Sequence, residues 1–356
     1  MILEKMSLTN FRSYAKCDVQ FGNGVNVIVG PNGSGKTNLA ESIHLMSLAK
    51  SWRTNESSTL IGVDYDYAYA EARVNNGGTT KTIGIQISQK GKRVLINGKP
   101  IRRLSELSKC VNVVVFSPED VSLFKGSPSD RRSFLDVNIS KRSLDYFSLI
   151  AKYNKLLEER NAALKSEPVD MTYLKVVTER LIEVEEPISR YRRLYVDELD
   201  KVLSEVASGL YGAERSVRIN YKPFIKSAEE FKSRATKLYD KSLESDIYHK
   251  STSIGLHRED FELMLDGKNI ALYGSQGENR LSAIALKMSP YFLIEDDDQK
   301  PIAVLDDVYS ELDNEHAARL TELVNKMGQT FITATKLEIE GATYIDVSSN
   351  KAVRRK

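Results

Sequence analysis

The chain has 356 residues, of which 41% are hydrophobic and 28% charged, so it can bury one large core or two modest ones, which excludes disordered and fibrous classes. Its 51 Lys and Arg residues against 49 Asp and Glu give a net charge of +2, which neither requires nor excludes an anionic partner, so any nucleic-acid surface must be local. Cys17 and Cys110 lie far apart and lack metal-ligand spacing, which predicts a cytoplasmic protein without a disulfide framework or structural zinc. No apolar run approaches the roughly 20 residues of a membrane span, so we expect no membrane partner.

The N-terminal third alternates short strand-like runs with turn residues, which predicts a strand-rich lobe. Leu39, Ile43 and Met46 recur at helical spacing and predict a helix over residues 35–49. The Asn97-Gly98 pair after RVLI predicts a hairpin turn. The predicted strands of this lobe are residues 2–8, 25–29, 65–74 and 81–87.

Residues 129–210 form long, charged, helical segments that break near residues 166–168. In the second segment apolar residues recur three or four apart from Leu174 to Leu210, which predicts a helix that buries one stripe on a neighbour. Pro187 interrupts this pattern, and an interior proline costs about 3 kcal/mol, so we expect a kink or two abutting helices there. Each arm could span about 40 residues, or roughly 60 Å at the helical rise.

The remainder of the chain alternates strands and helices, which favours an α/β fold. Helices are predicted over residues 279–293 and 314–326. We expect two domains, one of residues 1–128 together with 211–356 and one inserted helical lobe of residues 129–210. The predicted strands of this part are residues 216–221, 261–265, 302–307, 329–335 and 342–347.

Residues 30–37 read GPNGSGKT and match the pattern G-x-x-x-x-G-K-[ST] between an apolar strand and a predicted helix. Glycines in this pattern allow backbone N–H groups to turn toward phosphate oxygens, where side chains would block them. Lys36 supplies charge for the β- and γ-phosphates, and Thr37 offers a hydroxyl to Mg²⁺. The sequence therefore predicts a P-loop for ATP and Mg²⁺ formed by Gly30, Pro31, Asn32, Gly33, Ser34, Gly35, Lys36, Thr37 and Asn38.

A P-loop site also needs an acidic residue at the end of a buried strand, and IAVLDD at residues 302–307 provides two. Asp306 is predicted to hold Mg²⁺ through water, and Asp307 to be the base that orients the attacking water. Adjacent strand residues point to opposite sides, so the two carboxylates cannot share one role. With Lys36 they form the predicted catalytic set. Because Lys36 and Asp306 are 270 positions apart, an insertion must separate two halves of one core.

GPNGSGKT, YGSQGE at residues 273–278 and LDDVYSELD at residues 305–313 together resemble the ABC-type ATPase heads shared by transporters, Rad50, SMC proteins and RecF. Three further segments narrow the resemblance, namely LTNFRSY at residues 8–14, FSPEDVSLFKGSPSDRRSFLD at 116–136 and GLHRED at 255–260. With them the chain most resembles the RecF family of bacterial recombination-mediator ATPases. The resemblance covers essentially the whole chain and implies a P-loop NTPase of the ABC-ATPase head type, with a strand-rich ATP-binding lobe and an inserted α-helical lobe with a short arm.

The resemblance also implies a homodimer that forms on ATP, in which each P-loop site is completed by the signature motif of the other copy. Ser275 then matches the signature serine that contacts the γ-phosphate, and Gly277 keeps the backbone close to it. Asp313 matches the acidic end of the D-loop. Without the resemblance, Ser275 is interpreted as an ordinary helix N-cap.

The signature departs from the pattern of most ABC heads. Gln276 replaces the second signature glycine, as in RecF, and Glu278-Asn279 replaces the common Gln-Gln pair. The histidine that many heads carry after the last strand is missing from FITAT, where Thr333 or Thr335 would stand in for it. No residue near Phe116 matches the glutamine of a Q-loop.

The RecF resemblance implies a slow ATPase that yields ADP and phosphate and uses hydrolysis as a dimerisation switch. It further implies binding of double-stranded DNA at single-strand gaps, binding of single-stranded DNA, and RecR and RecO as partners that support RecA loading in repair, recombination and replication restart. Phosphate contacts by lysine and arginine are salt-dependent and sequence-blind. The candidate DNA contacts, each with a solvated helix face as its alternative, are Arg131, Arg132, Lys141, Arg142, Arg192 and Arg193.

Two other functions are consistent with an ABC-type head. One is the soluble cassette of a transporter, which does not need the helical insert or the FSPED and RR-FLD segments. The other is an SMC- or Rad50-like structural DNA tether, which needs longer arms, since about 80 helical residues cannot bridge distant sites.

Overall fold

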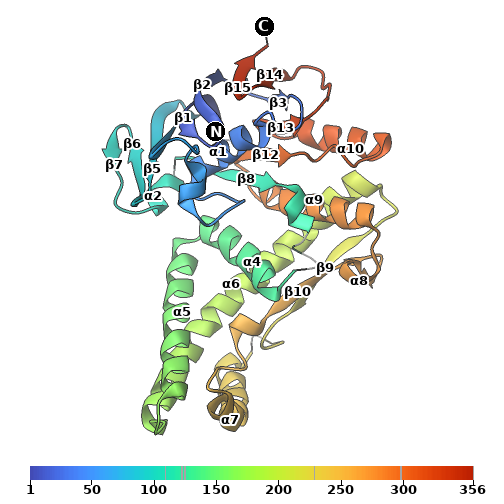
Figure 1. The fold of residues 1–356 in the computed structure, drawn as a ribbon. Helices are drawn as coiled ribbons and strands as arrows, with labels where there is room; N and C mark the ends of the chain where they lie inside the picture. The colour runs from blue at the N-terminus through green and yellow to red at the C-terminus, as the bar shows by residue number, and fades with distance from the viewer. Residues whose placement is uncertain (109, 122, 124–125, 228, 297–298, 356) are drawn as a thin grey trace. The chain divides into compact units, whose positions relative to one another are not determined.

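A computed structural model describes the chain except residues 109, 122, 124–125, 228, 297–298 and 356 (Figure 1). The chain forms two compact units. The first unit comprises Met1–Asp120, Val206–Glu214 and Ala283–Lys356, and the second comprises Val121–Glu205 and Arg215–Ser282. The predicted boundaries assign residues 211–282 to the strand-rich domain, whereas most of this stretch belongs to the second unit.

The first unit contains an antiparallel sheet with the strand order β2-β1-β4-β5-β6-β7. Its alternating burial follows the alternating sequence, with Ala68, Ala70, Ala72 and Val74 of β4 all buried. A turn at Asn97-Gly98 joins β6 to β7 as predicted, and Asn97 has a positive φ of 50°. The strands are β1 Ile2–Phe11, β2 Tyr14–Gln20, β4 Tyr67–Asn76, β5 Thr79–Ser88, β6 Gly91–Ile96 and β7 Lys99–Pro100.

A second sheet of the first unit has the order β15-β14-β3-β13-β12-β8, parallel except for β15. Strand β13 lies between β3, which precedes the glycine loop, and β12, which ends at Asp306. Because parallel strands end at the same edge, this order brings residues 30–37 and 306–307 to one edge of the sheet. The strands are β3 Val25–Val29, β8 Val113–Phe116, β12 Ile302–Asp306, β13 Thr330–Ala334, β14 Thr343–Ser348 and β15 Lys351–Arg354.

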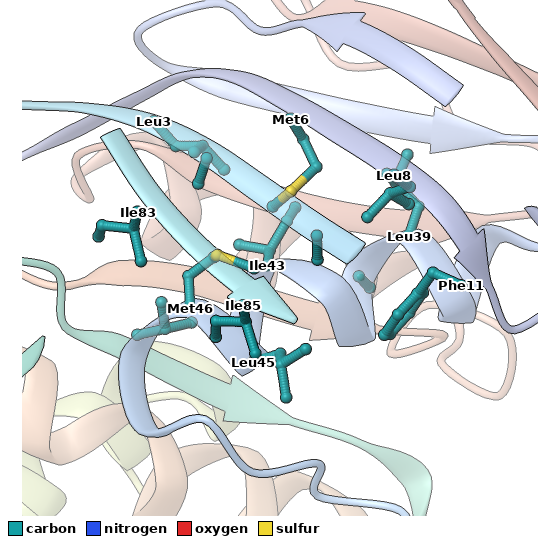
Figure 2. Packing of buried hydrophobic residues seen from close by; sticks show 14 of the residues in the cluster. Leu3, Met6, Leu8, Phe11, Leu39, Ile43, Leu45, Met46, Ile83 and Ile85 are labelled. Atoms are coloured by element: carbon teal, nitrogen blue, oxygen red, sulfur yellow. The ribbon is translucent and has the colours of Figure 1, made fainter. Parts of the chain in front are cut away.

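Helix α1, Lys36–Leu48, contacts strands of both sheets, including β5 and β12. Its apolar residues Leu39, Ile43 and Met46, predicted from their spacing, are at most 1% exposed. Figure 2 shows them beside Met6 of β1 and Ile85 of β5. The helix therefore fills the core that the two sheets share. The other helical segments of the unit are η1 Ser57–Leu60, α2 Ser105–Ser108, η2 Pro118–Val121 and α10 Asn314–Asn325.

A buried glutamine links the two sheets. The amide of Gln329, directly before β13, donates to the carbonyl oxygens of Leu3 in β1 and of Gly22, at 2.8 and 2.7 Å. Its Oε1 accepts the Leu3 N–H at 2.7 Å. Both backbone groups of Leu3 gain a partner from one side chain that is 1% exposed, so the β1 end of one sheet is held against the other. The Gly22 carbonyl also accepts from the amide of Asn26, at 2.9 Å.

The second unit contains long helices and a small antiparallel sheet of order β11-β10-β9. Residues 215–282 belong to it. Ion pairs join this sheet to the helices of the same unit, namely Arg218 with Asp200 and Arg131 with Asp260. The elements are α4 Pro128–Arg142, α5 Leu144–Lys165, α6 Met171–Tyr211, β9 Val217–Lys222, α7 Phe231–His249, η3 Leu256–Arg258, β10 Asp260–Leu265, β11 Lys268–Asn269, α8 Ile270–Tyr273 and α9 Gln276–Phe292, the last parts of α6 and α9 belonging to the first unit.

The predicted break in the arm at residues 166–168 is confirmed, because α5 ends at Lys165 and α6 begins at Met171. The alternative of two abutting helices at Pro187 is wrong, since α6 is one helix of 41 residues. Val184 and Ile188, on either side of the proline, are 2% and 0% exposed. Burying each such side chain contributes about 1.5–3 kcal/mol, which offsets the proline's cost of about 3 kcal/mol.

In the described part of the chain, no helix is both long and apolar enough to cross a bilayer. Strands β2 and β8 and helix α7 were not among the elements predicted from the sequence.

Gln329→Met keeps the side-chain volume but leaves the Leu3 N–H and the Leu3 carbonyl without their buried partner, while the Gly22 carbonyl keeps the amide of Asn26. We expect a loss of about 2–5 kcal/mol in the free energy of unfolding, because each unsatisfied buried group costs about 1–3 kcal/mol. Urea titration followed by circular dichroism measures it. Gln86→Met, on an exposed position of β5, is the matched control and should change stability little. An equal effect of both substitutions would contradict the role of Gln329.

Candidate functional site

The glycine loop lies between the end of β3 at Val29 and the start of α1 at Lys36. Gly33 and Gly35 have φ values of 78° and 107°, the left-handed region that glycine adopts without strain. A Cβ at Gly30 would lie 2.1 Å from the carbonyl oxygen of Val347, so that position admits only glycine. The hydroxyl of Ser34 is buried and has no hydrogen-bond partner among the residues that the structure describes. The loop thus has the backbone conformation that the motif predicts.

The ammonium group of Lys36 lies inside the loop. Its Nζ donates to the carbonyl oxygens of Gly30 and Pro31 at 2.8 and 2.9 Å. Burial lowers the pKa of Lys36, an effect opposed by the nearby charges of Asp307 and Asp306. The positive charge therefore sits where the loop curves, at the N-terminus of α1, whose dipole adds to it.

Asp306 ends β12, and its carboxylate faces the first turn of α1. The hydroxyl of Thr37 donates to Asp306 Oδ1 at 3.0 Å, and the hydroxyl of Thr333, from the intervening strand β13, donates to the same oxygen at 2.7 Å. Burial raises the pKa of Asp306, while the hydrogen bonds from Thr333 and Thr37 lower it. The structure thus brings together Thr37 and Asp306, the two predicted metal ligands.

Asp307 has a φ of 50°, unusual for a non-glycine residue, so the chain turns sharply after β12. Its backbone N–H donates to Thr333 Oγ1 at 2.9 Å. The single hydroxyl of Thr333 therefore holds both the carboxylate of Asp306 and the backbone of Asp307. Sequence analysis considered Thr333 only as a stand-in for a missing histidine, and this positioning contact follows from the strand order.

A buried ionic cluster beside the loop was not predicted. Glu41 in α1 is 0% exposed, and Arg12, at the end of the β1–β2 hairpin, reaches both of its carboxylate oxygens at 2.9 and 2.7 Å. Arg53 Nη1 lies 3.4 Å from Glu41 Oε2 and donates to Asn38 Oδ1 at 3.0 Å. Ser51 also donates to Glu41. The arginine at position 12 stands in the LTNFRSY motif, but its pairing with Glu41 depends on tertiary contact alone.

The signature segment belongs to the second unit, whereas the P-loop, Asp306 and Asp307 belong to the first. The Ser275 hydroxyl accepts the N–H of Glu278 at 3.2 Å, and the Glu278 carboxylate accepts the N–H of Ser275 at 2.8 Å. This capping box begins α9 and confirms the N-cap interpretation of Ser275. Arg215 binds Glu278 at 2.6 Å, and Asn279 donates to the carbonyls of Gly274 and Ser275. Glu278 and Asn279, which replace the common Gln-Gln pair of the signature, therefore stabilise the start of the helix.

The surface around the signature is exposed and carries both apolar and polar side chains. Leu272 and Tyr273 are each 73% exposed, Gln276 is exposed, and a Cβ at Gly277 would meet no atom within 4 Å. In the first unit, Asp313 is the N-cap of α10 and accepts the N–H of His316 at 2.9 Å. These residues are accessible to a second molecule.

Two of the predicted DNA contacts are corrected by their burial. Arg131 is 8% exposed and pairs with Asp260 through two hydrogen bonds of 2.7 and 2.9 Å. Arg192 is 2% exposed and pairs with Asp136 and Glu259 at 2.9 and 2.6 Å. A guanidinium buried against carboxylates cannot reach a DNA phosphate without losing those partners. The RR-FLD and GLHRED segments therefore stabilise the interior of the second unit.

The remaining predicted DNA contacts are less buried. Arg132 donates to the carbonyl of Glu259 at 2.9 Å, and Arg193 donates to the carbonyl of Lys226 at 2.7 Å. Arg142 pairs with Glu198 at 2.7 Å on the surface, and Lys141 stands beside it in α4.

Comparison with known proteins agrees with this geometry. Residues 2–350 match the family model described as the RecF/RecN/SMC N-terminal domain. The chain is 36% identical over 348 residues to the DNA replication and repair protein RecF of Geobacillus kaustophilus, covering 95% of this chain and 94% of the relative. The solved structure described as the recombination mediator protein RecF-ATP in the RecFOR pathway is 31% identical, covers 99% of both chains and has a TM-score of 0.88. An SMC head domain from Pyrococcus furiosus shares the fold, with 18% identity, 99% and 96% coverage and a TM-score of 0.61.

Arg12→Met should reduce the free energy of unfolding by about 3–5 kcal/mol, because it leaves the fully buried Glu41 carboxylate without its two-point partner. The double variant Arg12→Met with Glu41→Leu should recover most of this loss, since it removes the buried charge together with its partner. Urea titrations of both variants measure the difference. Equal destabilisation of the single and double variants would show that the carboxylate does not need Arg12.

Proposed function

The chain belongs to the RecF family of DNA replication and repair proteins, and we propose that it is an ATP-dependent DNA-binding protein that dimerises on ATP and acts at single-strand gaps. The observation that carries the proposal is the completed P-loop, with Lys36 inside the loop and Thr37 bonded to Asp306. The relatives named RecF and the RecF-ATP structure support ATP as the nucleotide.

The glycine loop fits a triphosphate. Its glycines permit inward-facing N–H groups, and the buried, unpartnered hydroxyl of Ser34 offers a further donor among the described residues. Lys36 would exchange its two carbonyl contacts for the β- and γ-phosphate oxygens, a stronger, charge-assisted interaction. Arg53, held by Glu41 and Asn38 beside the first turn of α1, adds positive charge near the same place.

Thr37 and Asp306 would hold Mg²⁺, since a hydroxyl and a carboxylate are oxygen ligands that this ion prefers. The ion would neutralise charge on the phosphates. Asp307, which follows Asp306 with a positive φ, is the proposed base that orients the attacking water. Thr333 would keep both residues in place during hydrolysis to ADP and phosphate.

We assign the signature to an interface between two copies. Ser275, Gln276 and Gly277 start a capped helix on an exposed surface, which suits a helix N-terminus to a phosphate of the other copy. Asp313 caps α10 on the first unit. Such contacts favour the dimer only while the γ-phosphate is present, so slow hydrolysis would release it.

The place of the protein in repair follows from its relatives. The RecF structure is described as a recombination mediator in the RecFOR pathway, which supports RecR and RecO as partners. RecA loading is the outcome that we propose for this partnership. Duplex DNA beside a gap, and single-stranded DNA, are the proposed nucleic-acid ligands. A structural tether is less favoured, because α5 has 22 residues and α6 has 41, which reach only about 33 and 62 Å.

Lys36→Ala should abolish ATP-dependent dimerisation, since the loop loses the charge that holds the β- and γ-phosphates. Asp307→Asn should bind ATP normally but hydrolyse it at least about 100-fold more slowly and accumulate dimers on DNA. Light scattering without nucleotide, with ADP and with ATP, each with and without gapped duplex, measures dimerisation of the two variants. The release of phosphate measures their rate of ATP hydrolysis. Lys232→Ala, on exposed α7, is the control and should dimerise normally. If both site variants behave like the unmodified protein, the switch mechanism is wrong.

A further inference from the structure

Charge is unevenly distributed along the chain. Residues 72–105 contain eight basic side chains and no Asp or Glu, a local charge of +8 in a chain whose net charge is +2. The rest of the chain therefore carries −6, and the segment stands out as the basic region of a nearly neutral protein. The eight side chains are Arg73, Lys81, Lys90, Lys92, Arg93, Lys99, Arg102 and Arg103.

The fold places most of these charges at one edge of the antiparallel sheet, formed by β5, β6 and β7. The N–H of Ile101 donates to the carbonyl of Val94 at 3.1 Å, so the chain after β7 runs along β6 and brings Arg102 and Arg103 close to Lys92 and Arg93. We name the side chains of Lys90, Arg93, Lys99, Arg102 and Arg103 the basic edge; all five are exposed. Among the described residues, none of the five makes an ion pair with an acidic side chain.

A cleft of about 460 Å³ adjoins the basic edge. Lys50, at the end of α1, and Lys92, from β6, both line it. Lys92 Nζ donates to the carbonyl of Ala49 at 2.7 Å, and its pKa is lowered by burial and by the charge of Lys50. Two ammonium groups that repel one another are both stabilised by an anion between them. The polar lining of the cleft is completed by Ser51, Thr54, Asn55 and Ser57, with no carboxylate among the described residues that line it.

We propose that the basic edge and the Lys50–Lys92 cleft bind the phosphate backbone of duplex DNA. The proposal rests on the DNA-binding function proposed above and assigns it to a surface that sequence analysis did not name. The arginines first considered, Arg131 and Arg192, are buried in ion pairs. In the described part of the chain, the side chains of the basic edge form no ion pair, although the Glu106 carboxylate accepts the backbone N–H groups of Arg102 and Arg103 at 3.1 and 3.0 Å. Lysine and arginine contacts with phosphates give binding without sequence preference.

The composition of the surface favours a duplex over a single strand. Proteins that bind single strands stack bases on aromatic side chains, and residues 72–105 contain no Phe, Tyr or Trp. Trp52, beside the cleft residue Ser51, packs against the core cluster and stacks edge-on with His44. Among the described residues, those of the basic edge and those that line the cleft thus offer charge and hydroxyl groups but no aromatic side chain.

The test is the binding of a fluorescein-labelled gapped duplex, and of a single-stranded oligonucleotide, by anisotropy from 50 to 300 mM KCl with ATP. Arg93→Ala with Arg102→Ala and Arg103→Ala should weaken duplex binding roughly 10- to 100-fold at 100 mM salt and reduce the slope of log K against log salt by about 2–3, since each phosphate contact contributes about 0.9. Lys50→Glu should weaken duplex binding by roughly 10-fold. Single-strand binding by the triple variant should change less than duplex binding.

The matched control removes three exposed lysines from α7, namely Lys232→Ala, Lys237→Ala and Lys241→Ala, and should leave both the affinity and the salt slope unchanged. Melting temperature and ATP binding report whether each variant is folded. If the unmodified protein binds duplex DNA and the triple variant binds it with the same salt slope, the assignment to the basic edge is overturned while the proposed function stands. If the unmodified protein does not bind DNA, the proposed function fails instead. A loss confined to single-stranded DNA also overturns the assignment.

Discussion

The carboxylate of Asp306 is the point on which the candidate site depends. It accepts hydrogen bonds from Thr37, 269 positions away in the sequence, and from Thr333 on the strand between. Both contacts require β3, β13 and β12 to lie in that order and in register, with their carboxyl ends together. The 41-residue helix, the small sheet and the signature are all inserted between two halves of this sheet. The insertion is tolerated because chain length alone costs little in loop closure, whereas the strand order determines the site.

The second unit uses arginine as a structural residue. Arg160 is 1% exposed and pairs with Asp246, which is 0% exposed, and Arg131 and Arg192 are buried in the same way. Removing one partner of such a pair leaves an uncompensated charge, so these pairs constrain which helices and loops can pack together. The same feature explains why basic motifs are a poor guide to the DNA surface of this chain. A cation in a short motif has the same appearance in the sequence whether a carboxylate or a phosphate faces it.

Local patterns were sufficient to predict the P-loop, the Asn97-Gly98 turn, helix α1 and the break between α5 and α6. Each depends on glycines, turn residues or an apolar period within a few positions. The contacts that the sequence could not show join distant segments: Arg12 with Glu41, Thr333 with Asp306 and Gln329 with Leu3. Of the two alternatives predicted at Pro187, two abutting helices is wrong, because the local cost of the proline is offset by buried neighbours such as Val184 and Ile188. The predicted boundary also placed residues 215–282 with the strand-rich domain, whereas their tertiary contacts, among them the ion pairs Arg131–Asp260 and Arg218–Asp200, group them with the helices of the second unit.

Two of the proposals have a joint physical consequence. Each copy carries its own basic edge, so a dimer whose two edges reach the same duplex would make twice as many phosphate contacts as a monomer. Affinity for DNA rises with the number of contacts, and the slope of log K against log salt steepens in proportion. A dimer that forms on ATP would therefore bind duplex DNA both more tightly and with greater salt sensitivity than the monomer, without any change in the surface itself. Hydrolysis would then release DNA by halving the number of contacts, which links the chemistry at Asp307 to binding at residues that need not touch the nucleotide.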